Sequence, residues 1–147
     1  MASRHYWEDQ DATALWNWAS HHPLLRNYLY HIPNGGKRGR IEAARMKGMG
    51  VRAGVSDYHL PLCRRGYYSL WVELKATPPN DAPVSKTQMD WLKKMSFEGH
   101  ACFVCKGWEA AVVVYKWYVG KRILHAESQL DDWIESGRIQ HIDIAVS

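Results

Sequence analysis

Three residues in the middle of the chain carry side chains that together suit hydrolysis of a phosphate ester: Asp57, Glu73 and Lys75. Glu73 and Lys75 stand two residues apart in the strand-like stretch SLWVELK. Side chains in a strand alternate between faces, so these two opposite charges project together. The stretch VSDYHL predicts a second strand, joined to the first through a turn at residues 64–66 as an antiparallel hairpin. Strand pairing in that hairpin would bring Asp57 near Glu73.

Two carboxylates beside a lysine suit a hard divalent cation such as Mg²⁺, which prefers oxygen ligands and keeps several waters. We expect Asp57 and Glu73 to hold the ion, together with the main-chain carbonyl of Leu74. A cation bound there would polarise a scissile phosphate and lower the pKa of an attacking water. Lys75 would orient or activate that water, and the glycines before Asp57 would let a phosphodiester backbone approach closely.

The same stretch has a simpler interpretation, namely an edge strand with one solvated face, on which a glutamate and a lysine are ordinary. Asp57 would then cap a turn or pair with an arginine. The order of features along the chain favours the chemical interpretation. A basic helix is followed by a glycine turn, the aspartate, a hairpin, E-x-K, and then a helix that carries Gln88.

Length and composition predict one domain with a substantial core, since the chain has 147 residues. No apolar run is long enough to span a bilayer, and the N-terminus lacks the apolar stretch of a signal peptide, so we expect a soluble cytoplasmic protein. Three cysteines do not suggest a secreted disulfide framework. Cys102 and Cys105 form a C-x-x-C inside a strand-like run, and we favour burial over a redox or metal role.

Positive charge gathers between Lys37 and Arg52, where six basic residues stand against the single acid Glu42. A clustered basic segment suits a polyanion such as nucleic acid, and a solvated helix face is the alternative interpretation. The basic residues that we expect to contact phosphates, without reading bases, are Lys37, Arg38, Arg40, Arg45 and Arg52.

Hydrophobic spacing predicts an alternation of helices and strands. We expect Ile41 and Ala44 of the basic helix to face inward, with Met46 or Met49 as a further candidate, and Ser85 to cap the helix that follows the hairpin. The helices are predicted at 8–22, 37–47, 84–100, 107–120 and 129–135. Strands are predicted at 26–32, 55–60, 67–75 and 100–106, with a further strand near the C-terminus.

Several stretches, taken in order, closely resemble the VRR-NUC domain, a branch of the PD-(D/E)xK nuclease superfamily: IPNGGKR, AARMKGMGVRAGVSDYHLP, GYYSLWVELK, VSKTQMDWL and GW. The resemblance covers about residues 8–117, which leaves 118–147 as a C-terminal extension of a single domain, 1–147. It implies an α/β fold with a restriction-endonuclease-like core, in which a central mixed β-sheet is flanked by α-helices. It also implies an Mg²⁺- or Mn²⁺-dependent phosphodiesterase that acts on DNA.

Residue by residue, the resemblance implies that Asp57 is the aspartate of the family signature G-V-P-D. Glu73 and Lys75 match its E-x-K, and Gln88 matches its helical glutamine. Ser56 stands where the family usually has proline. Because that proline shapes the turn and does not bind metal, we expect activity to survive.

The resemblance also implies that the N-terminal helix supplies an acid to the catalytic and metal-binding site. Glu8 and Asp11 both fit, because residues three apart share a helix face. We favour Glu8, since the longer acid matches the residue usual in the family.

The expected function is therefore a metal-dependent DNA endonuclease selective for branched DNA such as Holliday junctions. Small standalone members of the family are typical of phages and bacteria and resemble archaeal junction resolvases that form homodimers. Two sites in a symmetric dimer would suit a junction with two strands to cut. A phage-encoded protein would act in the bacterial host cell. The alternatives are a catalytically silent DNA-binding module, disfavoured by the intact acids, and an interaction domain using the eight tryptophans.

Overall fold

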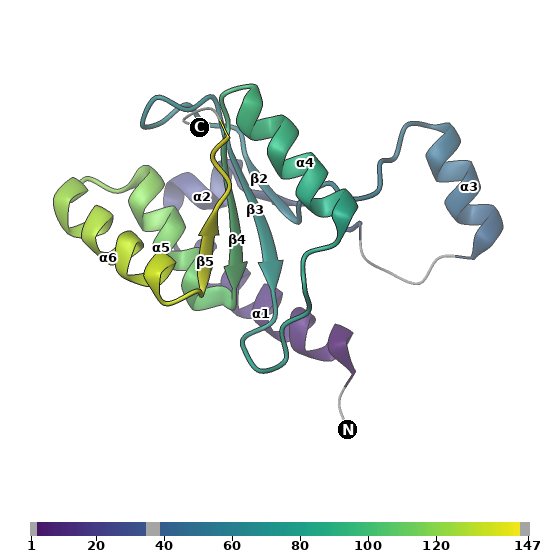
Figure 1. Cartoon of the computed structure of the whole chain (residues 1–147), viewed down its shortest axis with the longest axis horizontal. Coiled ribbons are helices and arrows are strands. Elements are labelled where there is room, and N and C mark those ends of the chain that lie inside the picture. The colour runs from purple at the N-terminus through teal and green to yellow at the C-terminus, as the bar shows by residue number, and fades with distance from the viewer. Residues whose placement is uncertain (1–2, 35–38, 145–147) are drawn as a thin grey trace.

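A five-stranded sheet with strand order β1-β2-β3-β4-β5 runs through the centre of the molecule (Figure 1). The computed structural model describes residues 3–34 and 39–144. β3 and β4 are parallel, and the other neighbouring pairs are antiparallel, so the sheet is mixed as expected. The strands are β1 (Tyr30–His31), β2 (Tyr58–Leu60), β3 (Leu70–Lys75), β4 (Ala101–Lys106) and β5 (Ile139–His141).

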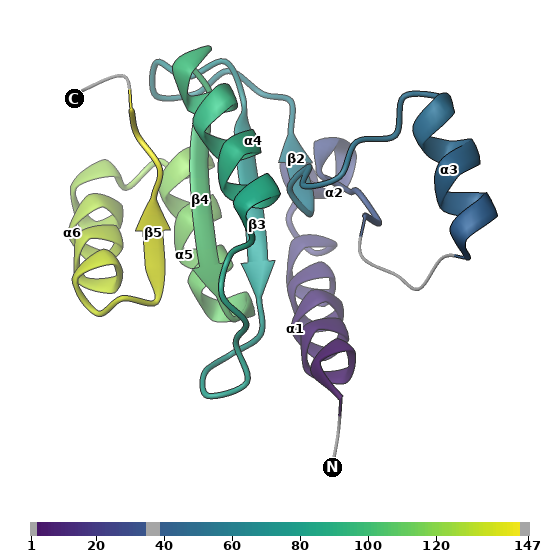
Figure 2. The ribbon, with the colours of Figure 1, turned by 45° about the vertical axis from the view of Figure 1, so that its right-hand side comes forward.

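Helices cover both faces of this sheet, and one further helix stands apart from it (Figure 2). The helices are α1 (Arg4–Ala19), α2 (Pro23–Tyr28), α3 (Arg40–Gly48), α4 (Lys86–Phe97), α5 (Trp108–Val119) and α6 (Ile123–Glu135). α1 and α5 pack on one face of β3, and α4 packs on the other, while α6 lies against α5 and β5. Within the described residues, no helix is long and apolar enough to cross a membrane.

The central strand β3 is buried along its whole length. Leu70, Val72 and Leu74 belong to the larger core, beneath α1 and α5. Trp71 points to the opposite face, where it packs with Leu92 of α4. This burial contradicts the alternative of an edge strand with a solvated face, because β3 lies between β2 and β4. Glu73 and Lys75 share the face of Trp71 and therefore project beneath α4.

The elements around the hairpin begin and end close to the predicted positions. Ser85 caps α4 as expected, because its side chain accepts the backbone N–H of Gln88 while the Gln88 side chain accepts the N–H of Ser85.

α5 contains the β-branched run Val112–Val114 and is still helical, since it is buried on most sides. Cys102 and Cys105 are buried in separate cores on opposite faces of β4, which leaves them apart.

The strand predicted at residues 26–32 is mostly wrong. α2 occupies Pro23–Tyr28, and β1 is only two residues long. A proline suits the first turn of a helix, and the His22 side chain accepts the backbone N–H of Leu25 as a cap. Near the other end of the chain, α6 begins at Ile123 rather than near Gln129.

The basic helix forms, but the expected inward face does not. None of its residues is buried, and Ile41 is 87% exposed. α3 projects from the sheet as an arm (Figure 2). The expectation that Ile41 and Ala44 pack inward is therefore wrong, because the spacing of apolar residues along a helix does not itself supply a surface to pack on.

Two buried tyrosines of α5 allow a direct test of this core. The Tyr115 hydroxyl has no hydrogen-bond partner in the part of the chain that the structure describes, whereas the Tyr118 hydroxyl donates to the Leu62 carbonyl at 2.6 Å. We expect Tyr115→Phe to raise the free energy of unfolding by about 1 kcal/mol and Tyr118→Phe to lower it by a similar amount. Urea denaturation measures both, and equal destabilisation by the two substitutions would contradict this account.

Candidate active site

Asp57 and Glu73 lie side by side at the end of the β2–β3 hairpin. The register pairs Tyr58 with Val72. Asp57, which directly precedes β2, therefore comes opposite Glu73 of β3. One carboxylate oxygen of Asp57, Oδ2, accepts the backbone N–H of Leu74 at 2.7 Å. This hydrogen bond holds the Asp57 side chain against β3, and the hairpin thus brings the two acids together.

Burial makes this carboxyl pair difficult to ionise. Glu73 is only 2% exposed, and burial together with the charge of Asp57 raises its pKa to about 9. Burial also raises the pKa of Asp57 to about 6, although the Leu74 N–H and the nearby His31 and Lys75 act in the opposite direction. A cation between the two groups would favour their charged forms.

Lys75 is the cation that the protein itself supplies to this pair. The lysine is 5% exposed, and its Nζ lies 3.7 Å from Glu73 Oε1. Lys75 Nζ also donates to Gln88 Oε1 at 2.9 Å. The same Gln88 oxygen accepts the N–H of Ser85, so the hydrogen bonds that cap α4 also fix the position of the lysine.

The two acids offered by the first helix have different surroundings. Glu8 lines a small cavity of about 90 Å³ with Asp57, His31 and Leu74. Asp11 is buried and accepts hydrogen bonds from residues outside this cavity, in the loop after β3 and at the start of α5. Of the two acids, the structure places Glu8 rather than Asp11 beside Asp57.

The donor atoms at this site fit a hard cation that keeps much of its water. Among residues 3–34 and 39–144, no three His, Cys, Asp or Glu side chains form a group able to hold a metal ion. The buried Glu73 Oε2 has no hydrogen-bond partner among the described residues, and the adjoining pair of acids has raised pKa values. Asp57 and Glu73 therefore offer carboxylate oxygens that a divalent cation would satisfy, with Glu8 at the edge of the cavity, and the Leu74 carbonyl stays a predicted third ligand.

Two further residues lie at or next to the site, although the sequence assigned neither of them a part in catalysis. His31 Nδ1 lies 2.9 Å from the Asp57 carbonyl and lines the small cavity, and only the pairing of β1 with β2 brings it there. Ser56, expected to replace a proline, is fully buried, and its hydroxyl has no partner in the described part of the chain. In the sequence, Ser56 is marked only by standing where the family signature has proline.

The basic residues expected to contact phosphate lie away from the carboxyl pair, on the arm formed by α3 and the segment after it. Arg40, Arg45 and Arg52 are exposed there. Arg45 is held by Glu42 in an ion pair of 2.7 Å. Lys37 and Arg38 lie outside the described residues.

No family model matches the sequence, and no curated protein matches it. A solved structure described as a "VRR_NUC domain protein" is similar with a TM-score of 0.67 and 28% sequence identity, over 77% of this chain and 88% of that chain. The mixed sheet with flanking helices is thus a nuclease-like α/β fold. Together with the sequence motifs, this similarity supports the resemblance of the chain to the VRR-NUC domain, a nuclease domain.

The raised pKa of Glu73 predicts how stability depends on pH in the absence of metal. The folded protein keeps this proton up to about pH 9, whereas an unfolded glutamate releases it near pH 4.3. The stabilisation that comes from the protonated Glu73 is therefore lost as the pH rises through that interval. We expect Glu73→Gln to be more stable than the wild type in EDTA, by a margin that grows from pH 5 to pH 9 in urea titrations. The exposed Glu135→Gln serves as the control, and a constant margin for Glu73→Gln would contradict the assignment.

The contrasting surroundings of Asp11 and Glu8 predict a separation of roles. Asp11→Ala removes the acceptor of three hydrogen bonds, from the Thr77 N–H, the Thr77 hydroxyl and the Trp108 N–H. We expect the free energy of unfolding at neutral pH to fall by about 3 kcal/mol. Glu8→Gln should change it by no more than about 0.5 kcal/mol. Thermal and urea denaturation measure both variants, and similar losses would refute the distinction.

Proposed function

We propose that the protein is a metal-dependent endonuclease that hydrolyses phosphodiester bonds in DNA. The observation that carries the proposal is the pair formed by the half-buried Asp57 and the buried Glu73, with Lys75 held beside it by Gln88. A domain that only bound DNA would have no use for two adjoining acids facing a polyanion. Similarity to a VRR-NUC domain protein supports the same conclusion.

The residues divide the work of hydrolysis among them. Asp57, Glu73 and the Leu74 carbonyl would hold Mg²⁺ or Mn²⁺, and Glu8 would complete the acidic side of the site. The bound cation would polarise the scissile phosphate and lower the pKa of the attacking water. Lys75 Nζ would orient that water and stabilise the negative charge that develops on the phosphate. Gln88 keeps Lys75 aimed at the site through its hydrogen bond at 2.9 Å.

The arm formed by α3 and the segment after it would hold the DNA. Arg40, Arg45 and Arg52 would contact backbone phosphates, which position a duplex without reading its sequence. Lys37 and Arg38 belong to the same basic stretch of the sequence. Contacts with the DNA backbone favour selection of a DNA structure over selection of a base sequence. We propose that the substrate is branched DNA such as a Holliday junction. Two strands must be cut to resolve a junction, and a homodimer would present one such site to each of them.

Cleavage of end-labelled DNA tests this proposal. We expect the wild type to nick a four-way junction in Mg²⁺ or Mn²⁺, to cut linear duplex more slowly, and to be inactive in EDTA. Asp57→Asn and Lys75→Ala should each lower the rate by about 100-fold or more, because each removes a group at the reacting phosphate. Exposed residues of α4 offer matched controls, Asp90→Asn and Lys93→Ala, which should cleave as the wild type does.

Thermal melting gives a second readout that does not depend on activity. Mg²⁺ should raise the melting temperature of the wild type and leave the melting temperature of Asp57→Asn unchanged, since a ligand stabilises only the state that binds it. If the wild type bound junction DNA, failed to cut it in either metal and melted alike with and without Mg²⁺, the catalytically silent module would replace the nuclease.

A further inference from the structure

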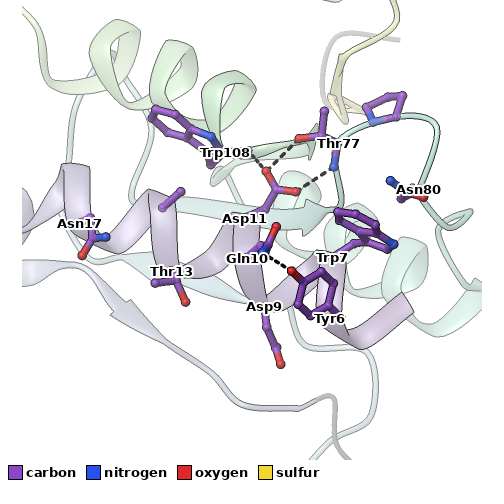
Figure 3. A pocket seen from close by; sticks show the side chains of 12 residues that line it. Tyr6, Trp7, Asp9, Gln10, Asp11, Thr13, Asn17, Thr77, Asn80 and Trp108 are labelled. Carbon is purple, nitrogen blue, oxygen red and sulfur yellow. Dashed lines mark hydrogen bonds between the residues drawn. The ribbon is translucent and has the colours of Figure 1, made fainter. Parts of the chain in front are cut away.

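A second, larger cavity of about 720 Å³ lies against the first helix, on the side that carries Asp11 (Figure 3). α1 forms one wall, the loop after β3 forms another, and Trp108 at the start of α5 closes one end. Figure 3 shows Tyr6 and Trp7 on the helix and Asn80 on the loop around the same space. Nothing in the proposed hydrolysis uses this cavity.

Asp11 makes the floor of the cavity rigid. It ties the helix to the loop through the Thr77 N–H and hydroxyl, at 2.9 and 2.8 Å, and to α5 through the Trp108 N–H at 2.9 Å. Asp11 thus accepts three hydrogen bonds from its own chain and acts as a structural group. The elements that carry the cavity lining are therefore held together before any ligand arrives, and the Tyr6 hydroxyl also accepts the Gln10 side-chain amide at 2.7 Å, which lowers the entropic cost of binding.

The lining chemistry suits a flat heterocycle rather than a phosphate group. Tyr6 is 47% exposed, and its ring lies beside that of Trp7, with ring centres 5.0 Å apart. Gln10 and Asn80 add amide groups that donate and accept hydrogen bonds. Among the side chains that the structure describes, none lining the cavity is a lysine, arginine or histidine, and Asp9 is acidic. Aromatic faces stack on nucleobases, and amide and carboxylate groups pair with their edges.

The cavity lies next to the proposed catalytic site. Asp9 lines both this cavity and the small one that holds Glu8 and Asp57. Thr77, which also lines this cavity, follows Lys75 of the proposed catalytic site by two residues. Two residues span about 7 Å along an extended chain. Successive bases of one DNA strand rise by about 3.4 Å, so a nucleotide close to the scissile phosphate is within reach.

We infer that this cavity receives an unpaired nucleobase from the DNA strand, close to the phosphate that is cut. The inference rests on the proposed nuclease function and deepens it, because it names the feature of branched DNA that the protein selects. A base can enter only where it is unstacked and unpaired, as at a branch point or a bulge. Regular duplex leaves the cavity empty and is therefore bound less well.

Binding measurements in EDTA test the inference independently of cleavage. The probes are a fluorescent duplex with a single unpaired adenine and the same duplex with an abasic residue at that position. We expect the wild type to bind the adenine bulge about tenfold more tightly, the effect of stacking one base on an aromatic side chain. Replacing the adenine by 2-aminopurine should give a fluorescence decrease on binding.

Two variants alter the cavity in opposite ways. Tyr6→Ala removes an aromatic wall, and Thr13→Trp fills the space from the exposed side of the same helix. Both should bind the adenine and abasic probes equally. Tyr28→Ala is the matched control, because Tyr28 is 48% exposed and lies on α2 outside the cavity. It should retain the tenfold preference.

The outcomes separate this inference from the nuclease proposal. Equal affinity of the wild type for the two probes, or loss of the preference in Tyr28→Ala, would overturn the base-binding cavity even if junctions are cut. A preference that disappears only in Tyr6→Ala and Thr13→Trp supports it. If that preference were found in a protein that cuts nothing in Mg²⁺ or Mn²⁺, the nuclease proposal would fail and the cavity would remain a base-binding site.

Discussion

The placement of two carboxyl groups side by side at the middle strand of the sheet, Glu73 buried and Asp57 half-buried, is the constraint on which the rest of the structure depends. A buried acid is stable only when it is protonated, hydrogen-bonded or paired with a cation. Here Asp57 receives one backbone N–H, and Glu73 shares Lys75 with Gln88. The buried faces of β3 and the helices on both sides hold these groups in place. Packing of the core thus keeps two neighbouring acids together, although their charged forms would repel each other.

Two polar residues connect this site to the architecture around it. Gln88 belongs to the capping box of α4 and bonds to Lys75, so the start of a helix and the position of the lysine cannot change independently. Asp11 joins α1, the loop after β3 and the start of α5 in the same manner. The site is thereby built on the ends of elements that the fold fixes, and such placement gives more precise geometry than mobile loops do.

The alternation within SLWVELK and the capping of α4 by Ser85 could be predicted from the sequence because both depend on neighbouring residues. The position of β3 in the middle of the sheet could not, since an alternating pattern is compatible with an edge or an interior strand. The end of α2, from Arg26 to Tyr28, falls within the strand predicted at 26–32 because Tyr and Leu residues are compatible with either state, whereas Pro23 and the cap by His22 favour a helix. The parts played by His31 and Asp11 depend on contacts with distant segments, which the spacing of residues does not encode.

The edges of the sheet are short: β1 has two residues and β5 has three. A short edge strand offers few unpaired backbone N–H and C=O groups, so the sheet is poorly suited to growth by addition of a strand from another chain. Copies of the protein that meet would therefore do so through side chains of the helices and loops. Such a contact can change by substitution on the surface without disturbing the pairing that holds the carboxyl groups together.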